Sequence, residues 1–165
     1  VHFIGTGQTG ILLSESGVPI DAIISDFMVG EVEHCLDQLP ENTDLAIVEG
    51  QGSINNMHYS GVTLGLLHGC MPDYLIFTHE PIRKMDVAGH PIPDLLQLMD
   101  LYLDLMRPFK KTKYLGVNLL TIKLNENEAK KVKQTLSKKL KLPVSDIVRW
   151  KDEKFIDDIQ NSIFK

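Results

Sequence analysis

The sequence has few cysteines and no long apolar run, and both absences narrow the class of protein it can represent. Cys35 and Cys70 are the only two cysteines in 165 residues. They could pair with each other, but separate buried thiols in a reducing compartment are the favoured interpretation. No apolar stretch reaches the roughly 20 residues that cross a bilayer, and no signal peptide opens the chain. We therefore expect a cytoplasmic protein without a membrane partner.

The chain also lacks an excess of positive charge, internal repeats and a start methionine. Its formal net charge of −5 argues against a nucleic-acid or anionic-membrane partner. Its length and its 43% hydrophobic content predict one soluble α/β domain over residues 1–165. Because Val1 already lies in a predicted strand, we expect this domain to be a fragment of a longer chain.

The most informative stretch is an apolar run over residues 45–48, which predicts a buried strand. It ends in Glu49, followed by Gly50, Gln51, Gly52 and Ser53. Ligands of parallel α/β sheets bind just beyond the carboxyl ends of the strands. There a carboxylate can hold Mg²⁺ or orient a polar substrate, and glycines let backbone N–H groups approach an anion.

A second stretch of the same design opens the chain. A predicted strand over residues 1–4 leads into Gly5-Thr6-Gly7-Gln8-Thr9-Gly10. This is not a Walker A loop, because no Gly-Lys-Ser/Thr follows. It predicts either a tight turn that needs positive φ or a cradle for an anion. Together the two strand ends predict one polar site.

Strand and helix patterns alternate about five times, which predicts a mostly parallel sheet with helices on both faces. Apolar spacing and turn residues place helices at 28–39, 62–70, 94–106, 125–140 and 152–163, and further strands at 74–77, 114–122 and 143–148. The wide apolar surface of helix 94–106 is compatible with a subunit contact, so a homo-oligomer is one expectation.

Four other residues carry candidate chemistry. Asp26 precedes the helix at 28–39 and is either a plain helix cap or a ligand for a metal or substrate. His79 follows the strand at 74–77 and is a candidate catalytic base, although a hydrogen-bonded strand-end histidine explains it equally simply. Arg83 and Lys84 lie in a long loop that is either a solvated loop or an anion clamp.

Five motifs occur in this order in the DUF1611 family. They are FIGTGQTG at 3–10, SDF at 25–27, VEGQGS at 48–53, SGVT with LLHG at 60–69, and PIP at 91–93. The sequence resembles this family over nearly its whole length. The resemblance implies a P-loop-type α/β fold, and some members are described as D-glutamate N-acetyltransferases. The family's Walker A loop would lie upstream of Val1, so the lysine that holds the β- and γ-phosphates is not in this sequence.

The family's nucleotide-binding half is similar to dethiobiotin synthetase, where a Val-Glu-Gly segment supplies a Mg²⁺-binding glutamate. By this resemblance Glu49 and Asp26 are metal ligands, and Gln8, Thr9 and Gln51 lie near the phosphate or substrate. The expected cofactor-binding set is Gly7, Gln8, Thr9, Gln51, Gly52 and Ser53. The expected catalytic residues are Glu49 and His79. The implied cofactors are Mg²⁺ with ATP, or acetyl-CoA.

Three functions follow as hypotheses. The first is N-acetyl transfer to D-glutamate or a related small acidic amino acid. The second is a Mg-ATP-dependent ligase or kinase of the dethiobiotin synthetase type, which needs the upstream Walker A loop. The third is a ligand-binding module without catalytic activity.

Overall fold

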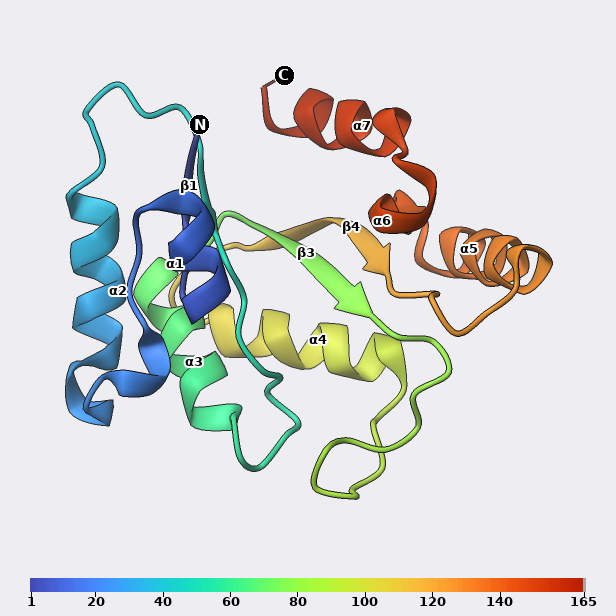
Figure 1. Ribbon diagram of the computed structural model, residues 1–165, viewed down its shortest axis with the longest axis horizontal. Helices are drawn as coiled ribbons and strands as arrows, with labels where there is room; N and C mark the ends of the chain where they lie inside the picture. Colours follow the sequence, from blue (N-terminus) through green and yellow to red (C-terminus); the bar gives the residue numbers. More distant parts are fainter. Residues whose placement is uncertain (165) are drawn as a thin grey trace. The chain divides into compact units, whose positions relative to one another are not determined.

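A computed structural model describes residues 1–164, and the chain divides into two compact units (Figure 1). The first unit comprises residues 1–72 together with 85–91, and the second comprises residues 73–84 and those from 92 onward. Each unit contains its own small sheet of parallel strands, flanked by helices. The predicted α/β class with parallel strands is confirmed, and the strands lie in two sheets.

In the first unit, β1 (His2–Ile4) pairs in parallel with β2 (Ala46–Val48), so that Ile4 lies opposite Val48. The helices are α1 (Gln8–Ser14), η1 (Ile20–Ala22), η2 (Ser25–Phe27), α2 (Met28–Asp37) and α3 (Ser60–Cys70). The core is formed by apolar residues from the segment after α1, from α2 and from α3: Val18, Ile20, Met28, Val32 and Leu66.

Helices α2 and α3 pack closely because α3 carries glycines on the face that meets α2. A Cβ on Gly65 would lie 2.6 Å from the Met28 sulfur, and one on Gly69 would lie 2.7 Å from Val32 Cβ. A Cβ on Gly61, by contrast, would meet no atom of the described chain within 4 Å.

In the second unit, three parallel strands lie in the order β3 (Tyr74–His79), β4 (Lys113–Leu119) and β5 (Val144–Ser145). The helices are α4 (Leu95–Met106), α5 (Glu126–Leu140), α6 (Ile147–Trp150) and α7 (Glu153–Ile163). Its main core joins Leu95 and Met99 of α4 to Val117 and Leu119 of β4, and Val144 completes it.

A capping box opens α5. The Asn125 side chain accepts a hydrogen bond from the Glu128 N–H, and the Glu128 carboxylate accepts one from the Asn125 N–H, both at 3.0 Å. Asp94 caps α4 by accepting from the Leu96 N–H at 2.9 Å. These local signals explain why both helices were predicted within one or two residues of their observed ends.

The segment after β1 differs from the prediction. Residues 5–10 were expected to form a turn, but Gln8 begins α1, which continues to Ser14. The N-cap residue of α1 is Gly7, whose position carries no side-chain cap. Among the glycines of the described chain, positive φ, which the predicted turn required, occurs instead at Gly17, Gly52 and Gly89. The sequence contains no local signal for this helix, because the group that caps it lies elsewhere in the chain.

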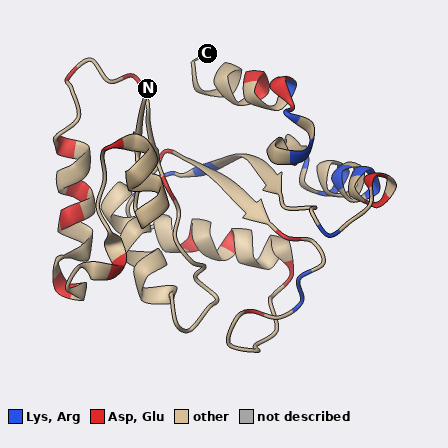
Figure 2. Ribbon diagram, viewed as in Figure 1, with Lys and Arg blue, Asp and Glu red and all other residues tan. Residues whose placement is uncertain are grey.

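Charge is divided unequally between the two units, as Figure 2 shows. All 17 Lys and Arg residues lie in the second unit, and the first unit contains none. The first unit holds ten carboxylates: Glu15, Asp21, Asp26, Glu31, Glu33, Asp37, Glu41, Asp44, Glu49 and Asp86. The units therefore carry formal charges of −10 and +5, which together give the −5 of the chain. Among residues 1–164, no helix has the length and apolar character that a membrane span needs.

Candidate functional site

The Glu49 carboxylate lies at the carboxyl end of β2 and binds the backbone of the segment that follows β1. Its Oε2 accepts hydrogen bonds from the Thr6 N–H at 2.8 Å and the Gly7 N–H at 3.0 Å. The Thr6 hydroxyl donates to the Glu49 carbonyl oxygen at 2.9 Å. The two strand ends that the sequence paired in one polar site are thus joined directly, with Glu49 between them.

This carboxylate supplies the N-terminal cap that α1 lacks. The first N–H groups of a helix have no partner within the helix, and its dipole favours a negative charge there. Thr6 and Gly7 immediately precede α1, and their N–H groups point at Glu49 Oε2. Both N–H groups are therefore already bound to a carboxylate of the protein itself.

Three positions of this loop must be glycine, because neighbouring atoms leave no room for a Cβ there. A Cβ on Gly10 would lie 2.1 Å from Glu49 Oε2, and one on Gly7 would lie 2.6 Å from the Gln51 side-chain nitrogen. A Cβ on Gly5 would lie 2.4 Å from the backbone of Gly10. Side chains at these three positions would push the β1 end, α1 and Glu49 apart.

The segment after Glu49 is held by α3. The Thr63 hydroxyl donates to the Gln51 carbonyl oxygen at 2.8 Å and to the Tyr59 carbonyl oxygen at 3.0 Å. Gly52 has a φ of +61°, and a Cβ there would lie 2.5 Å from Tyr59 Cβ. The Ser53 hydroxyl donates to the Asn55 side chain. These contacts place the Gln51 side chain beside Gly7, where both were expected to bind cofactor.

The other expected residues of the first unit are more exposed. Gln8 and Thr9 lie exposed on the first turn of α1. Asp26 is exposed within η2, and the N-cap residue of α2 is Phe27. The plain-cap interpretation of Asp26 is therefore wrong. Residues 1–164 contain no group of three or more His, Cys, Asp or Glu side chains that could hold a metal ion. A cation near Glu49 would therefore need further ligands that are not protein side chains. Water and phosphate oxygens supply such ligands to Mg²⁺.

His79 lies at the end of β3 in the second unit and is half-buried. Burial lowers the pKa of His79, and the nearby Lys84 lowers it further, while Asp94 and Glu80 act in the opposite direction and only partly compensate. The imidazole is therefore mainly neutral near pH 7, which is the form that accepts a proton.

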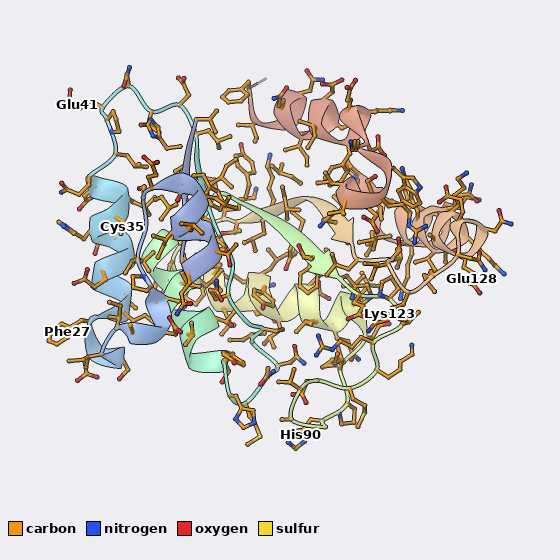
Figure 3. The ribbon with its side chains drawn as sticks, viewed as in Figure 1. Phe27, Cys35, Glu41, His90, Lys123 and Glu128 are labelled. Atoms are coloured by element: carbon orange, nitrogen blue, oxygen red, sulfur yellow. The ribbon has the colours of Figure 1, made fainter. Side chains whose placement is uncertain are left out.

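The neighbouring charges of the β3 end form ion pairs with one another. The Lys123 ammonium lies 2.7 Å from a Glu80 oxygen, and an Arg83 nitrogen lies 3.9 Å from the other Glu80 oxygen. The Lys123 hydrogen bond and charge lower the pKa of Glu80, with a smaller contribution from Arg83. Figure 3 labels Lys123 at this end of the unit. Arg83, for which a solvated loop and an anion clamp were the two alternatives, thus already has a carboxylate beside it.

A buried polar network at the ends of β4 and β5 was not predicted from the sequence. One Asp146 oxygen accepts from the Thr121 N–H at 2.8 Å and from the Thr121 hydroxyl. The Arg149 guanidinium donates to the Thr121 hydroxyl at 2.8 Å and to the Leu124 carbonyl oxygen at 2.7 Å. Burial raises the pKa of Asp146, but the Thr121 and Arg149 hydrogen bonds and the Arg149 charge together lower it. No spacing in the sequence connects Thr121 with Asp146, so only the fold reveals the network.

Together, parallel strands, a glycine-rich segment entering a helix and a carboxylate at the next strand end define an α/β protein with a polar site at the carboxyl ends of its strands. The family model described as "Domain of unknown function (DUF1611_C) P-loop domain" matches residues 1–156. The chain therefore belongs to the DUF1611 family, as its motifs indicated.

Three similar proteins extend this result. A protein of Tritonibacter scottomollicae named D-glutamate N-acetyltransferase is 39% identical over 160 residues, which cover 94% of this chain and 47% of that protein. A protein of the same name from Pseudoalteromonas sp is 51% identical over 79 residues, covering 48% of this chain and 24% of that protein. The crystal structure of a DUF1611 family protein from Anabaena variabilis has a TM-score of 0.88 and 30% identity, covering 96% of this chain and 48% of that one. The chain thus spans about half the length of the first relative and of the solved structure.

Proposed function

We propose that this chain is part of an N-acyltransferase that acetylates D-glutamate or a related small acidic amino acid. The observation that carries this proposal is the 39% identity, over 94% of the chain, to a protein named D-glutamate N-acetyltransferase. In this reaction the amine nitrogen attacks the acetyl carbonyl carbon, an amide bond forms, and the thioester C–S bond of acetyl-CoA breaks. The thiol leaves with the proton that the amine gives up.

The residues around Glu49 support an anchoring role for the first unit. In the proposed enzyme, the segment from Gly7 to Thr9 and the segment from Gln51 to Ser53 bind the polar part of the substrate or cofactor. Glu49 fixes the relation between these segments through its bonds to the Thr6 and Gly7 N–H groups. Its second carboxylate oxygen is the atom that we assign to a cation.

The proton of the substrate ammonium must go to a base before the nitrogen can attack. His79 is the better-suited base, because the pKa of its imidazole is lowered and its neutral form prevails near pH 7. Glu49 is the second candidate. Arg83 and Lys84, close to His79 in the chain, are the cations that we assign to a substrate carboxylate.

Charge limits which cofactor the first unit can bind alone. ATP, acetyl-CoA and D-glutamate are all anions, and the first unit has no Lys or Arg and ten carboxylates. Mg²⁺ fits this setting on chemical grounds, since it takes one or two carboxylates together with water and phosphate oxygens. We assign Glu49 and Asp26 as its protein ligands, where the ion would neutralise phosphate charge.

The description of the family as a P-loop domain favours a second candidate, a Mg-ATP-dependent ligase or kinase of the dethiobiotin synthetase type. This alternative needs a lysine for the phosphates, which would come from the part of the relatives that this chain does not span. The two candidates differ in whether ATP is consumed.

The test is calorimetric binding and turnover with the full-length protein. ATP is titrated with and without Mg²⁺, then acetyl-CoA, then D-glutamate, with L-glutamate as the matched control. Release of free thiol and of inorganic phosphate is followed in parallel. Thiol release that requires D-glutamate supports the acyltransferase, whereas phosphate release that requires Mg²⁺ moves the assignment to the ligase or kinase. Binding without either product rejects both enzymes and leaves a ligand-binding module.

The variants Glu49→Gln and His79→Gln then divide the roles. We expect His79→Gln to lower kcat most near and above pH 7, where the unmodified imidazole is neutral and can accept a proton, with little change in KM; the two kcat values should converge at low pH, where His79 is protonated. Glu49→Gln should weaken binding of whichever cofactor requires Mg²⁺. Full activity of both variants would remove these residues from the site.

A further inference from the structure

The first unit carries an open apolar groove that the proposed function does not use. It encloses about 520 Å³ between the η2–α2 segment and residues 57–68. Met28, Val29 and Val62 form much of its lining. Val29 is 41% exposed and Met57, at its edge, is 66% exposed. Flexible methionine side chains suit a surface that adapts to an inserted side chain.

An acidic row continues this groove along α2. Glu33 and Asp37 follow Val29 at intervals of four residues and are both exposed, so the three lie on one helix face. Like charges at this spacing destabilise a helix, and the helix dipole disfavours a carboxylate in the last turn. No Lys or Arg of the first unit offsets them (Figure 2). The groove and its acidic row therefore favour an occupant with an apolar side chain and flanking cations.

A segment of this kind lies on the second unit, between α4 and β4. Residues 107–113 read RPFKKTK. Phe109 is 61% exposed, and Arg107 and Lys111 beside it are also exposed. Full burial of an aromatic side chain removes on the order of 150–250 Å² of surface, and the exposed part of Phe109 offers a share of that area. Its charge is opposite to that of the acidic row.

We propose that the groove of one copy of this chain binds residues 107–113 of a second copy, with Phe109 in the groove and its flanking cations against Glu33 and Asp37. Groove and segment are different surfaces, so the contact is heterologous and leads to closed rings or to extended chains. One aromatic anchor and a few exposed ion pairs give a weak contact, with a Kd on the order of 0.01–1 mM.

Sedimentation velocity on the full chain tests the contact. We expect the average mass to rise above that of the monomer with concentration at about 0.05 M NaCl, and to fall back at about 0.5 M, where charges are screened over a few ångströms. Phe109→Ser should abolish association. Phe164→Ser is the matched control, because Phe164 is 58% exposed and lies at the end of α7. A monomer at every concentration, or equal loss with both variants, overturns the proposal.

Charge-reversal variants distinguish this specific pairing from nonspecific association. Glu33→Lys with Asp37→Lys makes the acidic row basic. Arg107→Glu with Lys110→Glu and Lys111→Glu leaves Lys113 as the one cation of the segment and makes the segment acidic. Each variant should stay monomeric alone, and an equimolar mixture should associate again, since every row then meets a segment of opposite charge. A mixture that stays monomeric, while the unmodified chain associates, overturns the assigned pairing and points to another surface.

Discussion

The contact between Gly10 and Glu49 makes a quantitative prediction about what holds the candidate site together. A Cβ on Gly10 would lie 2.1 Å from Glu49 Oε2, so Gly10→Ala must displace the carboxylate. The displaced oxygen loses its hydrogen bonds to the Thr6 and Gly7 N–H groups. Hydrogen bonds to a charged group contribute about 1.5–3 kcal/mol each, and for this half-exposed carboxylate we take the lower end, about 3 kcal/mol for two.

Helix propensity acts in the opposite direction. Replacing a helical glycine by alanine stabilises a helix by about 1 kcal/mol, so the net cost of Gly10→Ala is about 2 kcal/mol. In a Glu49→Ala background the carboxylate is absent, and the same substitution should stabilise the protein by up to about 1 kcal/mol. The difference is a coupling free energy of about 3 kcal/mol between the two positions.

Urea unfolding followed by circular dichroism of the four chains of this cycle measures the coupling. Amide hydrogen exchange at Thr6 and Gly7 reports directly on the two hydrogen bonds and should accelerate in Gly10→Ala. Gly61→Ala on α3 is the matched control, because its Cβ meets no atom of the described chain within 4 Å and should only stabilise. An equal cost of Gly10→Ala in both backgrounds would refute the assigned contact, since the clash would then lie with the backbone.

Two further predictions concern titratable groups. Because the pKa of His79 is lowered in the folded chain, the unfolded chain binds more protons as pH falls through the ordinary histidine range; stability therefore decreases there. His79→Gln should reduce the loss of unfolding free energy between about pH 7.5 and about pH 5.5, measured by Trp150 fluorescence in urea, and an unchanged loss would contradict the assignment. Burial, with a smaller effect of Cys35, raises the pKa of Cys70 to about 12. At about pH 8 the Cys70 thiolate is then roughly a thousandfold scarcer than that of an unfolded cysteine, so iodoacetamide should label Cys70 correspondingly slowly until urea unfolds the chain. Fast labelling in the folded state would disprove the burial of Cys70.

The elements predicted from the sequence are those whose signals are local. Helix α5 is defined by its capping box and by the apolar spacing of Ala129, Val132 and Leu136, all within one segment. The strand ending at Glu49 is defined by an apolar run and the glycines that follow. Such signals depend only on residues that are close together in the chain, so they can be recognised from the sequence without knowing the fold.

The features that escaped prediction depend on residues far apart in the chain. Helix α1 has no local cap, because its N-terminus is bound by a carboxylate that lies 42 or 43 positions later. The buried Asp146 network joins Thr121 to a residue 25 positions away. In both cases one polar side chain completes the hydrogen bonds of a distant backbone, and only the paired strands bring the two together.

The net charge of the whole sequence likewise cannot show where in the fold an anionic ligand could bind. The net charge of −5 is the sum of −10 and +5, so it conceals that the first unit contains no Lys or Arg and the second contains all of them. The expectation drawn from the sum, that anionic partners are disfavoured, applies strongly to the first unit and not to the second. Locating the boundary needs the structure, because residues 85–91 return to the first unit after the chain has entered the second. An anionic substrate bound at Glu49 therefore needs a cation from outside the first unit, and the Mg²⁺ dependence of binding is the property that decides whether that cation is a metal ion.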